Sequence, residues 1–297
     1  MGLLKGYTKQ EISWMMYDWA NSAHSVIVVT LLPIFFDTVA GYTADSVSSM
    51  STWGYATSIA MAIVAIAAPF LGVFGDIRGM RKRLFSVFMI LGVVAVALMS
   101  FTPLMDFTSS TAAAGRVAGF ILVLYILSVI GFDASAIYYD AFLTDVTTPE
   151  RMDRVSTMGY GLGYIGGSTI PLVIFLVMNL VGVPMLTCLA VIFAITAIWW
   201  LVFSLPLLKN CQQTSGKPYE KGDVGRSIRG VGTTIKEIIA NKPMLVYILA
   251  YFFYIDGVHT VISMATTYGT NLGLDSTGML LALLLVQVLG LPFCLLY

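Results

Sequence analysis

The chain has 297 residues, of which 58% are hydrophobic and only 11% are charged. A soluble domain carries roughly 25% charged residues, so 16 basic and 16 acidic side chains are too few to cover a water-soluble globule of this length. The formal net charge is zero and no basic stripe runs along the sequence, which argues against a nucleic-acid partner. The composition predicts an integral membrane protein.

Apolar runs long enough to cross a bilayer recur along the whole chain. A hydrocarbon core of about 30 Å needs roughly 20 apolar residues per helix. Eight runs meet this length, near residues 14–37, 52–75, 84–102, 117–140, 156–180, 184–206, 243–268 and 277–297. Alternation with a period of two is absent, so we expect an all-α membrane protein rather than a barrel. The first run lacks a small-residue cleavage pattern, which indicates a retained span and not a signal peptide.

The basic residues indicate the orientation of these spans. Fifteen of the 16 Lys and Arg residues fall in segments on one side of the membrane, and only Arg116 falls on the other. The positive-inside rule then places the N-terminus in the cytoplasm. We therefore expect a multi-pass protein of the cell membrane.

A polar stretch at residues 207–242 divides the chain, with a short amphipathic helix expected around 227–240. Six spans precede it, in residues 1–206, and two follow, in residues 243–297. Six spans, a cytoplasmic linker and more spans are typical of a transporter built from two six-helix halves. The sequence thus predicts a complete first half and an incomplete second half, as if the chain were truncated.

Two similar polar patterns support the idea of repeated halves. Residues 18–25 (DWANSAHS) and 256–263 (DGVHTVIS) place polar groups at i, i+3, i+4 and i+7, which is one face of a helix. They lie in the first and seventh spans, which correspond to each other if the halves are repeats. A match this short can also arise by chance.

The segment after the second span, GVFGDIRGMRKR at 72–83, resembles the loop 2–3 signature of the major facilitator superfamily, although Ile77 stands where a basic residue is usual. Together with YDWANS at 17–22, DAFL at 140–143, GLGYIGG at 161–167 and DGVHTVI at 256–262, the chain resembles the vacuolar amino-acid effluxer-like branch of that superfamily. The resemblance extends over the chain in order. It implies about twelve spans and export of amino acids or similar metabolites.

The resemblance also implies a conformational latch in this loop, with a far partner in the second half. Its residues would be Gly72, Asp76, Arg78, Gly79 and Arg81. A simpler interpretation treats the basic residues as ordinary positive-inside charge.

Ionisable groups within the spans are the main candidates for a transport site. Burying one in hydrocarbon costs roughly 2.5–3.5 kcal/mol on insertion scales, so such residues are usually functional. The predicted substrate or proton pathway comprises Asp18, Asn21, His24, Asp133, Asp256 and His259. The spans that carry them, the first, fourth and seventh, line the central cavity in the superfamily. Alternatively, these groups only satisfy one another in helix contacts.

Residues 161–166 match the letters of a dinucleotide fingerprint, but they lie in an apolar run without a preceding strand. Gly159, Gly163 and Gly167, four residues apart, instead predict close packing against another helix. The cysteines Cys188, Cys211 and Cys294 lack metal-ligand spacing, and Cys211 lies in a polar segment. We expect neither a metal nor a cofactor.

These features favour a secondary transporter that moves a small polar solute by alternating access, with proton coupling and efflux as the expected mode. The acidic, His-bearing spans suit a proton, an amine or a cation. One alternative is a truncated fragment without transport of its own, which associates with a complementing chain. Another is a membrane-embedded enzyme, although the chain has neither an HExxH nor a GxSxG motif.

Overall fold

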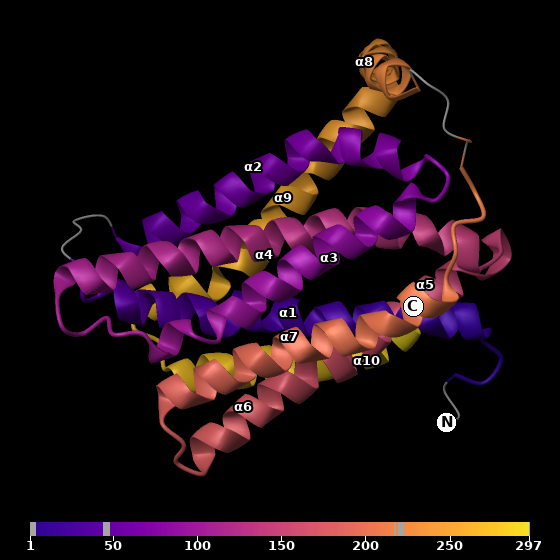
Figure 1. Cartoon of the computed structure of the whole chain (residues 1–297). Helices are drawn as coiled ribbons and strands as arrows, with labels where there is room; N and C mark the ends of the chain where they lie inside the picture. Colours follow the sequence, from indigo (N-terminus) through magenta and orange to yellow (C-terminus); the bar gives the residue numbers. More distant parts are fainter. Residues whose placement is uncertain (1–3, 44–47, 217, 219–222, 297) are drawn as a thin grey trace.

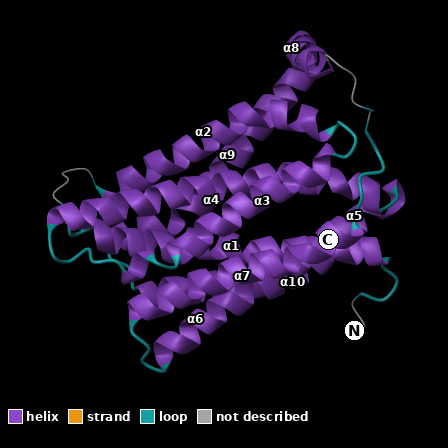
Figure 2. Cartoon of the chain, viewed as in Figure 1, coloured by secondary structure: helices purple, strands orange, loops and turns teal. Residues whose placement is uncertain are grey.

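The computed structural model describes residues 4–43, 48–216, 218 and 223–296. Helices and loops account for these residues, and no β-strand of more than a single bridge occurs among them (Figure 2). The helices are α1 (Lys9–Ala40), α2 (Ser49–Gly75), α3 (Met80–Met99), η1 (Thr102–Leu104), α4 (Thr111–Val146), η2 (Pro149–Arg151), α5 (Met152–Leu162), η3 (Gly163–Thr169), α6 (Ile170–Leu180), α7 (Met185–Asn210), α8 (Asp223–Ala240), α9 (Lys242–Asn271) and α10 (Ser276–Leu296). The predicted all-α class is confirmed.

Seven stretches of helix are long and apolar enough to cross a membrane, counted over the described residues. They correspond to the first seven predicted spans. The eighth predicted span coincides with α10, whose apolar portion found among these residues, Thr277–Gly290, is shorter. Most of these helices run side by side along one direction, as expected for a membrane bundle (Figure 1).

Helix α1 runs through the middle of the bundle and packs against α4, α5, η3 and α7 (Figure 1). It begins at Lys9, five residues before the predicted span, because a capping box stabilises its first turn. The Thr8 hydroxyl accepts a 3.2 Å hydrogen bond from the Glu11 amide, and the Glu11 carboxylate accepts one of 2.7 Å from the Thr8 amide. Hydropathy alone misses this start, since the capping residues are polar.

Two groups of buried apolar side chains surround α1. One lies around its second half and includes Phe35, Trp53 and Phe193. The other lies around its first half and includes Trp14 and Trp200. Large aromatic side chains bury much apolar area per residue, and they fix the positions of the polar groups between them.

The fifth predicted span, 156–180, is interrupted by a π-helical segment, η3, between α5 and α6. The Thr169 hydroxyl donates a 2.7 Å hydrogen bond to the carbonyl of Tyr164, five residues earlier, which suits the wide π-helical turn. Such segments occur frequently at functional sites.

Helices α8 and α9 extend away from the compact part of the bundle. Helix α8 lies at one end of the molecule and packs against α2 and α9, while α9 crosses toward it from the neighbourhood of α1 (Figure 1). The sequence predicts a helix at 227–240, and α8 occupies these residues with one more turn at its start.

Candidate functional site

Asp18 is a carboxylate that lies among buried aromatic residues within the first span. It lies on α1, is buried, and accepts a 2.7 Å hydrogen bond from the Tyr139 hydroxyl on α4. On its other side lies Gly159 of α5, where a Cβ atom would collide with the Asp18 carboxylate. Three helices therefore meet at one intramembrane acid, a residue class that is costly to bury and usually functional.

Aromatic contacts hold Tyr139 in place. Its ring stacks on that of Trp14 with centroids 4.3 Å apart, and the Trp14 indole donates a 2.9 Å hydrogen bond to the Tyr139 carbonyl. Beside it, the hydroxyls of Tyr17 and Ser135 are hydrogen-bonded at 2.7 Å. The Asp18 carboxylate thus faces a rigid hydrogen-bond donor.

Gly163 and Gly167 continue the line that Gly159 begins, and all three face α1. A Cβ atom at Gly163 would collide with Ser22, and one at Gly167 would meet the Trp19 carbonyl. The absence of side chains lets α5 and η3 approach α1 closely, as in other membrane helix pairs with small residues at the interface.

His24 lies on the same helix as Asp18 but in apolar surroundings. Its ring packs between Phe132 and Trp200, each with its centroid 4.9 Å away. Both imidazole nitrogens are buried, and neither has a hydrogen-bond partner among the described residues. Asn21, one turn before it, is also buried. Among the described residues, no hydrogen bond joins His24 to an acid.

Asp133 is half-buried on α4, and one of its carboxylate oxygens is buried without a hydrogen-bond partner in the part of the chain described. Asp140, seven residues later, is exposed. Asp133 lies within electrostatic reach of Tyr125, whose hydroxyl is hydrogen-bonded at 2.9 Å to that of Thr57 on α2. The hydroxyl pair thus connects the neighbourhood of Asp133 on α4 with Thr57 on α2.

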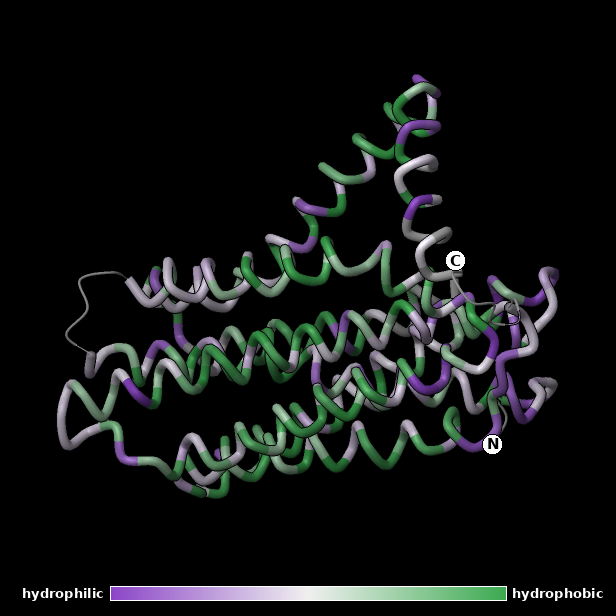
Figure 3. The backbone as a smooth tube through the Cα atoms, turned by 45° about the horizontal axis from the view of Figure 1, so that its top comes forward, coloured by the Kyte–Doolittle hydropathy of each residue, from purple (hydrophilic) through white to green (hydrophobic). Residues whose placement is uncertain are grey.

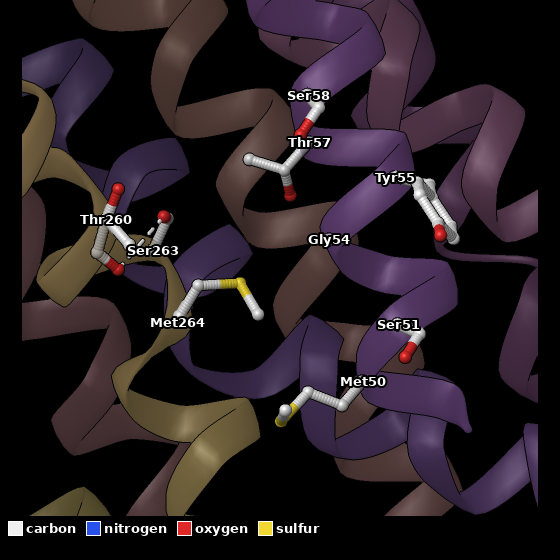
Figure 4. A pocket seen from close by; sticks show the side chains of 9 residues that line it. All are labelled: Met50, Ser51, Gly54, Tyr55, Thr57, Ser58, Thr260, Ser263 and Met264. Atoms are coloured by element: carbon white, nitrogen blue, oxygen red, sulfur yellow. Dashed lines mark hydrogen bonds between the residues drawn. The ribbon is translucent and has the colours of Figure 1, made fainter.

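Thr57 lines a cavity of about 390 Å³ between α2 and α9. Figure 4 shows it on one side of this space, with Thr260 and Ser263 of α9 on the other. A second cavity of about 610 Å³ adjoins the first, between α9 and α10, and its walls are mostly apolar. The hydroxyl groups that line the first cavity can accommodate water or a small polar solute.

Asp256 and His259 are both exposed on α9. The predicted pathway residues thus fall into two sets: the buried or half-buried groups on α1 and α4, and the exposed pair on α9. No hydrogen bond or ion pair among the described residues joins the sets. No group of three His, Cys, Asp or Glu side chains suited to a metal ion occurs in the described ranges either.

Three of the predicted latch residues, Gly72, Asp76 and Gly79, lie at or beside the turn between α2 and α3. Gly79 adopts φ = +83°, a conformation that favours glycine, and its amide donates a 2.8 Å hydrogen bond to the side chain of Gln213. The Gly72 carbonyl accepts a 3.1 Å hydrogen bond from the Asp76 amide at the end of α2. Arg78 is exposed.

Arg81, in contrast, is buried and has a partner within the first six spans. Its guanidinium lies 2.5 Å from the Asp145 carboxylate at the end of α4, and it also donates to the Ala141 carbonyl at 2.9 Å. Asp76, the expected acid of the latch, is 82% exposed and lies 3.8 Å from Arg81. The acid that pairs with Arg81 most closely is therefore Asp145, which sequence reasoning missed.

Residues 211–216, which follow α7, cover this ion pair. The Asp145 carboxylate accepts hydrogen bonds from the backbone amides of Thr214 and Ser215 at 3.0 and 2.9 Å. The side-chain amide of Gln213 donates to the Gly75 carbonyl at 3.0 Å. The start of the linker thereby ties the α2–α3 turn to the end of α4.

A second ion pair, also missed, joins the start of α1 to the segment between α4 and α5. Arg151 donates two hydrogen bonds of 2.8 Å to the two oxygens of Glu11, and Thr147 donates a third, of 2.7 Å. Its only sequence signal is that Glu11, the N3 residue of the capping box, is an acid close to the basic loops.

Cys211 is fully buried although the segment around it in the sequence is polar. It follows α7 directly, and its thiol lies 3.6 Å from the Gln10 carbonyl. Burial raises the pKa of this thiol to about 12. The polar neighbours of Cys211 in sequence belong to the segment that covers the Arg81–Asp145 pair.

Comparisons with known proteins match one family model and several relatives, over different shares of the chain. The family described as "Vacuole effluxer Atg22 like" matches residues 41–292. The chain is 38% identical to the "Uncharacterized MFS-type transporter YxiO" of Bacillus subtilis over 303 residues, which cover 99% of this chain and 68% of the relative. It is 26% identical to "Autophagy-related protein 22-1" of Penicillium rubens over 148 residues, 46% of this chain and 25% of that protein. For "Autophagy-related protein 22-2" of Aspergillus clavatus the identity is 27% over 140 residues, 42% and 23% of the two chains.

Proposed function

Since this chain belongs to the family of Atg22-like vacuole effluxers, we propose that it is a secondary transporter of a small polar solute, an amino acid or a related metabolite. Transport proceeds by alternating access, in which one group of helices rocks against another around a site near the middle of the membrane. The expected direction is export, which is supported by the word "effluxer" in the family description.

The observation that carries this proposal is the contact of Asp18 with Tyr139 and Gly159. An intramembrane carboxylate enclosed by three helices has little structural benefit over an apolar side chain of similar size, so its presence favours a functional role. Its position beside the α5–η3 junction is equally suggestive, because a π-helical segment at this point allows the backbone to change its pairing.

We propose that transport is coupled to protons, with Asp18 and Asp133 as the groups that bind them. The stability of each carboxylate's surroundings depends on whether the carboxylate is protonated. Asp18 accepts a hydrogen bond from Tyr139, and Asp133 has a buried oxygen without a hydrogen bond among the described residues. Binding or loss of a proton changes the charge of these interiors and thus the relative stability of two helix arrangements.

The orientation and location remain those predicted from charge, with the N-terminus in the cytoplasm and the protein in the cell membrane. The structure supports this proposal indirectly. Arg81 lies beside the end of α4, and Arg151 beside the start of α1, so the basic segments gather at one end of the bundle. A common end for the basic segments is what the positive-inside rule requires.

We also propose that further protein covers α9 in the membrane. Asp256 and His259 are exposed on a helix long enough to span the bilayer, and polar groups facing lipid are unfavourable. Additional spans of the family type, or a complementing chain, would shield them. Without this cover, we expect no transport.

The test is proton-linked flux in proteoliposomes that contain either the 297-residue chain or the same chain extended by four family-like spans after Tyr297. The probe is a mixture of the standard amino acids with an imposed pH gradient, followed with a trapped pH dye. We expect saturable flux from the extended chain only. Flux from the purified monomeric chain would contradict the covering proposal, and flux from neither would contradict the transporter proposal.

Variants of the extended chain test the assigned residues. Asp18→Asn, Asp133→Asn and Asp256→Asn should abolish proton-linked flux, and His259→Gln should shift its pH dependence. The matched control is Asp106→Asn, because Asp106 lies in the η1–α4 loop, outside the spans, where hydrogen bonds from Ser109 and Thr108 lower its pKa. Unchanged pH profiles in all four site variants would assign these residues to packing alone. Flux-independent hydrolysis of a substrate would favour the enzyme alternative.

A further inference from the structure

Helix α8 lies outside the packed bundle of spans, and it is one of the most amphipathic segments of the chain. In Figure 1 it is seen nearly end-on, whereas the spans run across the view, so its axis lies across the span direction. In the turned view of Figure 3 it extends beside the bundle end. A helix across the spans at their end lies parallel to the membrane surface.

The apolar residues of α8 follow a helical pattern. Val or Ile occupies positions 224, 228, 231, 235, 238 and 239. Most of these positions are three or four residues apart, so their side chains lie on one face of the helix. Ile235 is 50% exposed and Ile239 58% exposed, so the bundle does not bury this face. Apolar surface of this kind gains stability from contact with another apolar medium.

The charged residues beside this apolar face indicate that it contacts a lipid membrane. The linker residues 207–242 contain seven basic and three acidic side chains. Within α8, Arg229 and Lys236 are exposed and, being seven residues apart, lie on the same flank of the apolar face. Thr233, also exposed, lies on the opposite side of the helix from Ile235 by the same geometry.

We propose that α8 is an interfacial helix that binds the anionic headgroups of the adjoining membrane leaflet. Ile235 and Ile239 enter the boundary between headgroups and acyl chains, and Arg229 and Lys236 contact lipid phosphates. An amphipathic helix with basic residues beside its apolar face lies in the interface plane and prefers anionic lipid. This binding site does not depend on the transported solute or on the orientation of the chain.

The binding has a consequence for α9. Asn241 separates the two helices by a single residue, and its side chain caps α9 by accepting a 3.3 Å hydrogen bond from the Met244 amide. With so short a connection, an α8 that is held at the headgroups fixes the depth and direction of the start of α9. The lipid thereby sets the position of the helix that carries Asp256 and His259.

Spin-label depth measurements on the whole chain in vesicles test this proposal. A label at Ile239→Cys is compared with one at Thr233→Cys, both in a background where the three native cysteines are alanine. The vesicles contain phosphatidylcholine alone or with phosphatidylglycerol. We expect the ratio of oxygen to nickel-complex collision rates to be several-fold higher at 239 than at 233, and the difference to increase with phosphatidylglycerol.

Variants that remove basic residues distinguish binding to anionic lipid from burial of α8 in a non-specific apolar environment. Arg229→Gln combined with Lys236→Gln should remove the effect of phosphatidylglycerol on the label at 239. The control pair, Lys5→Gln with Lys209→Gln, removes two exposed basic residues outside α8 and should retain it. Equal nickel access at 233 and 239 would place α8 in water and overturn the proposal. Exclusion of both collision partners at 239 would show a protein partner and would also overturn it.

Discussion

The Asp18 carboxylate occupies the space that a methyl group on Gly159 would need. This relationship joins α1 to α5 at a point where Tyr139 of α4 also binds the same carboxylate. The close approach of backbone and acid is possible only because position 159 lacks a side chain. Helix packing and the candidate transport site therefore depend on the same residue.

Gly159→Ala should consequently destabilise the protein. Forcing an extra methyl group into a packed site costs about 1–3 kcal/mol, which thermal unfolding in detergent would detect as a lower midpoint. Gly115→Ala on α4 is the control, because the added Cβ there meets no atom within 4 Å beyond its neighbours in the chain and the backbone of its own helix. Removing a glycine from a helix gains about 0.5–1 kcal/mol, so this control should be neutral or stabilising. Equal effects at both positions would refute the proposed contact.

Tyr139→Phe removes the hydrogen bond to Asp18 and keeps the ring that stacks on Trp14. A hydrogen bond to a charged group contributes about 1.5–3 kcal/mol, and one between neutral groups about 0.5–1.5 kcal/mol. Tyr138→Phe is the matched control, since the Tyr138 hydroxyl donates to a neutral acceptor, the Leu71 carbonyl, at 3.0 Å.

We expect the Tyr139 variant to lose more unfolding free energy than the Tyr138 variant, and the gap to widen as pH rises. The reason is that an ionised carboxylate accepts a hydrogen bond more strongly than a protonated one. A gap that is independent of pH over the range in which the protein stays folded would mean that Asp18 does not change its charge.

Arg81→Gln should be among the more damaging substitutions at the basic end of the bundle. The side chains of Arg81 and Asp145 are 6% and 0% exposed, and removing one partner of a buried ion pair costs about 3–5 kcal/mol. Asp76→Asn should cost about 0–1 kcal/mol, because that side chain is 82% exposed. Unfolding midpoints of the two variants give the comparison. A larger loss from Asp76→Asn would restore Asp76 as the main partner.

Much of the fold can be predicted from the sequence, because each membrane span needs an apolar run of a fixed minimum length. The length of the apolar runs predicts the spans, and their termination by basic segments predicts the polar linker and α8. Where the prediction fails locally, a polar or conformational effect outweighs hydropathy. The capping box lengthens α1 at its start, and glycines at 163, 166 and 167 permit the π-helical segment within the fifth span.

The candidate site is readable only in part, since sequence shows which groups are ionisable but not which groups they meet. Asp18 stands out in its span, yet its donor Tyr139 is 121 residues away. Arg81 belongs to a recognisable motif, but Asp145, 64 residues later, resembles any acid at the end of a helix. His24 looks like a partner for an acid and instead packs between two aromatic rings.

The last prediction concerns the reactivity of the Cys211 thiol. Because this thiol is buried, we expect it to be unreactive although the surrounding sequence is polar. In a variant that keeps Cys211 and has alanine at positions 188 and 294, a maleimide should not react with the folded protein near pH 7. The thiolate is the reactive form. With a pKa of about 12 instead of about 9, the fraction of thiolate at this pH is negligible, and the buried sulfur is also inaccessible.

Denaturation should expose Cys211 and allow full labelling, which controls for loss of the thiol by oxidation. Gln212→Cys, with Cys211→Ala added, places the thiol at the next position, which is exposed. It should react in the folded state, and in intact cells only with a reagent that crosses the membrane, because residue 212 belongs to the linker that the basic residues place inside. Labelling of residue 212 by an impermeant reagent would reverse the proposed orientation. Rapid labelling of Cys211 itself would show that the segment of residues 211–216 opens, and with it the cover over Arg81 and Asp145.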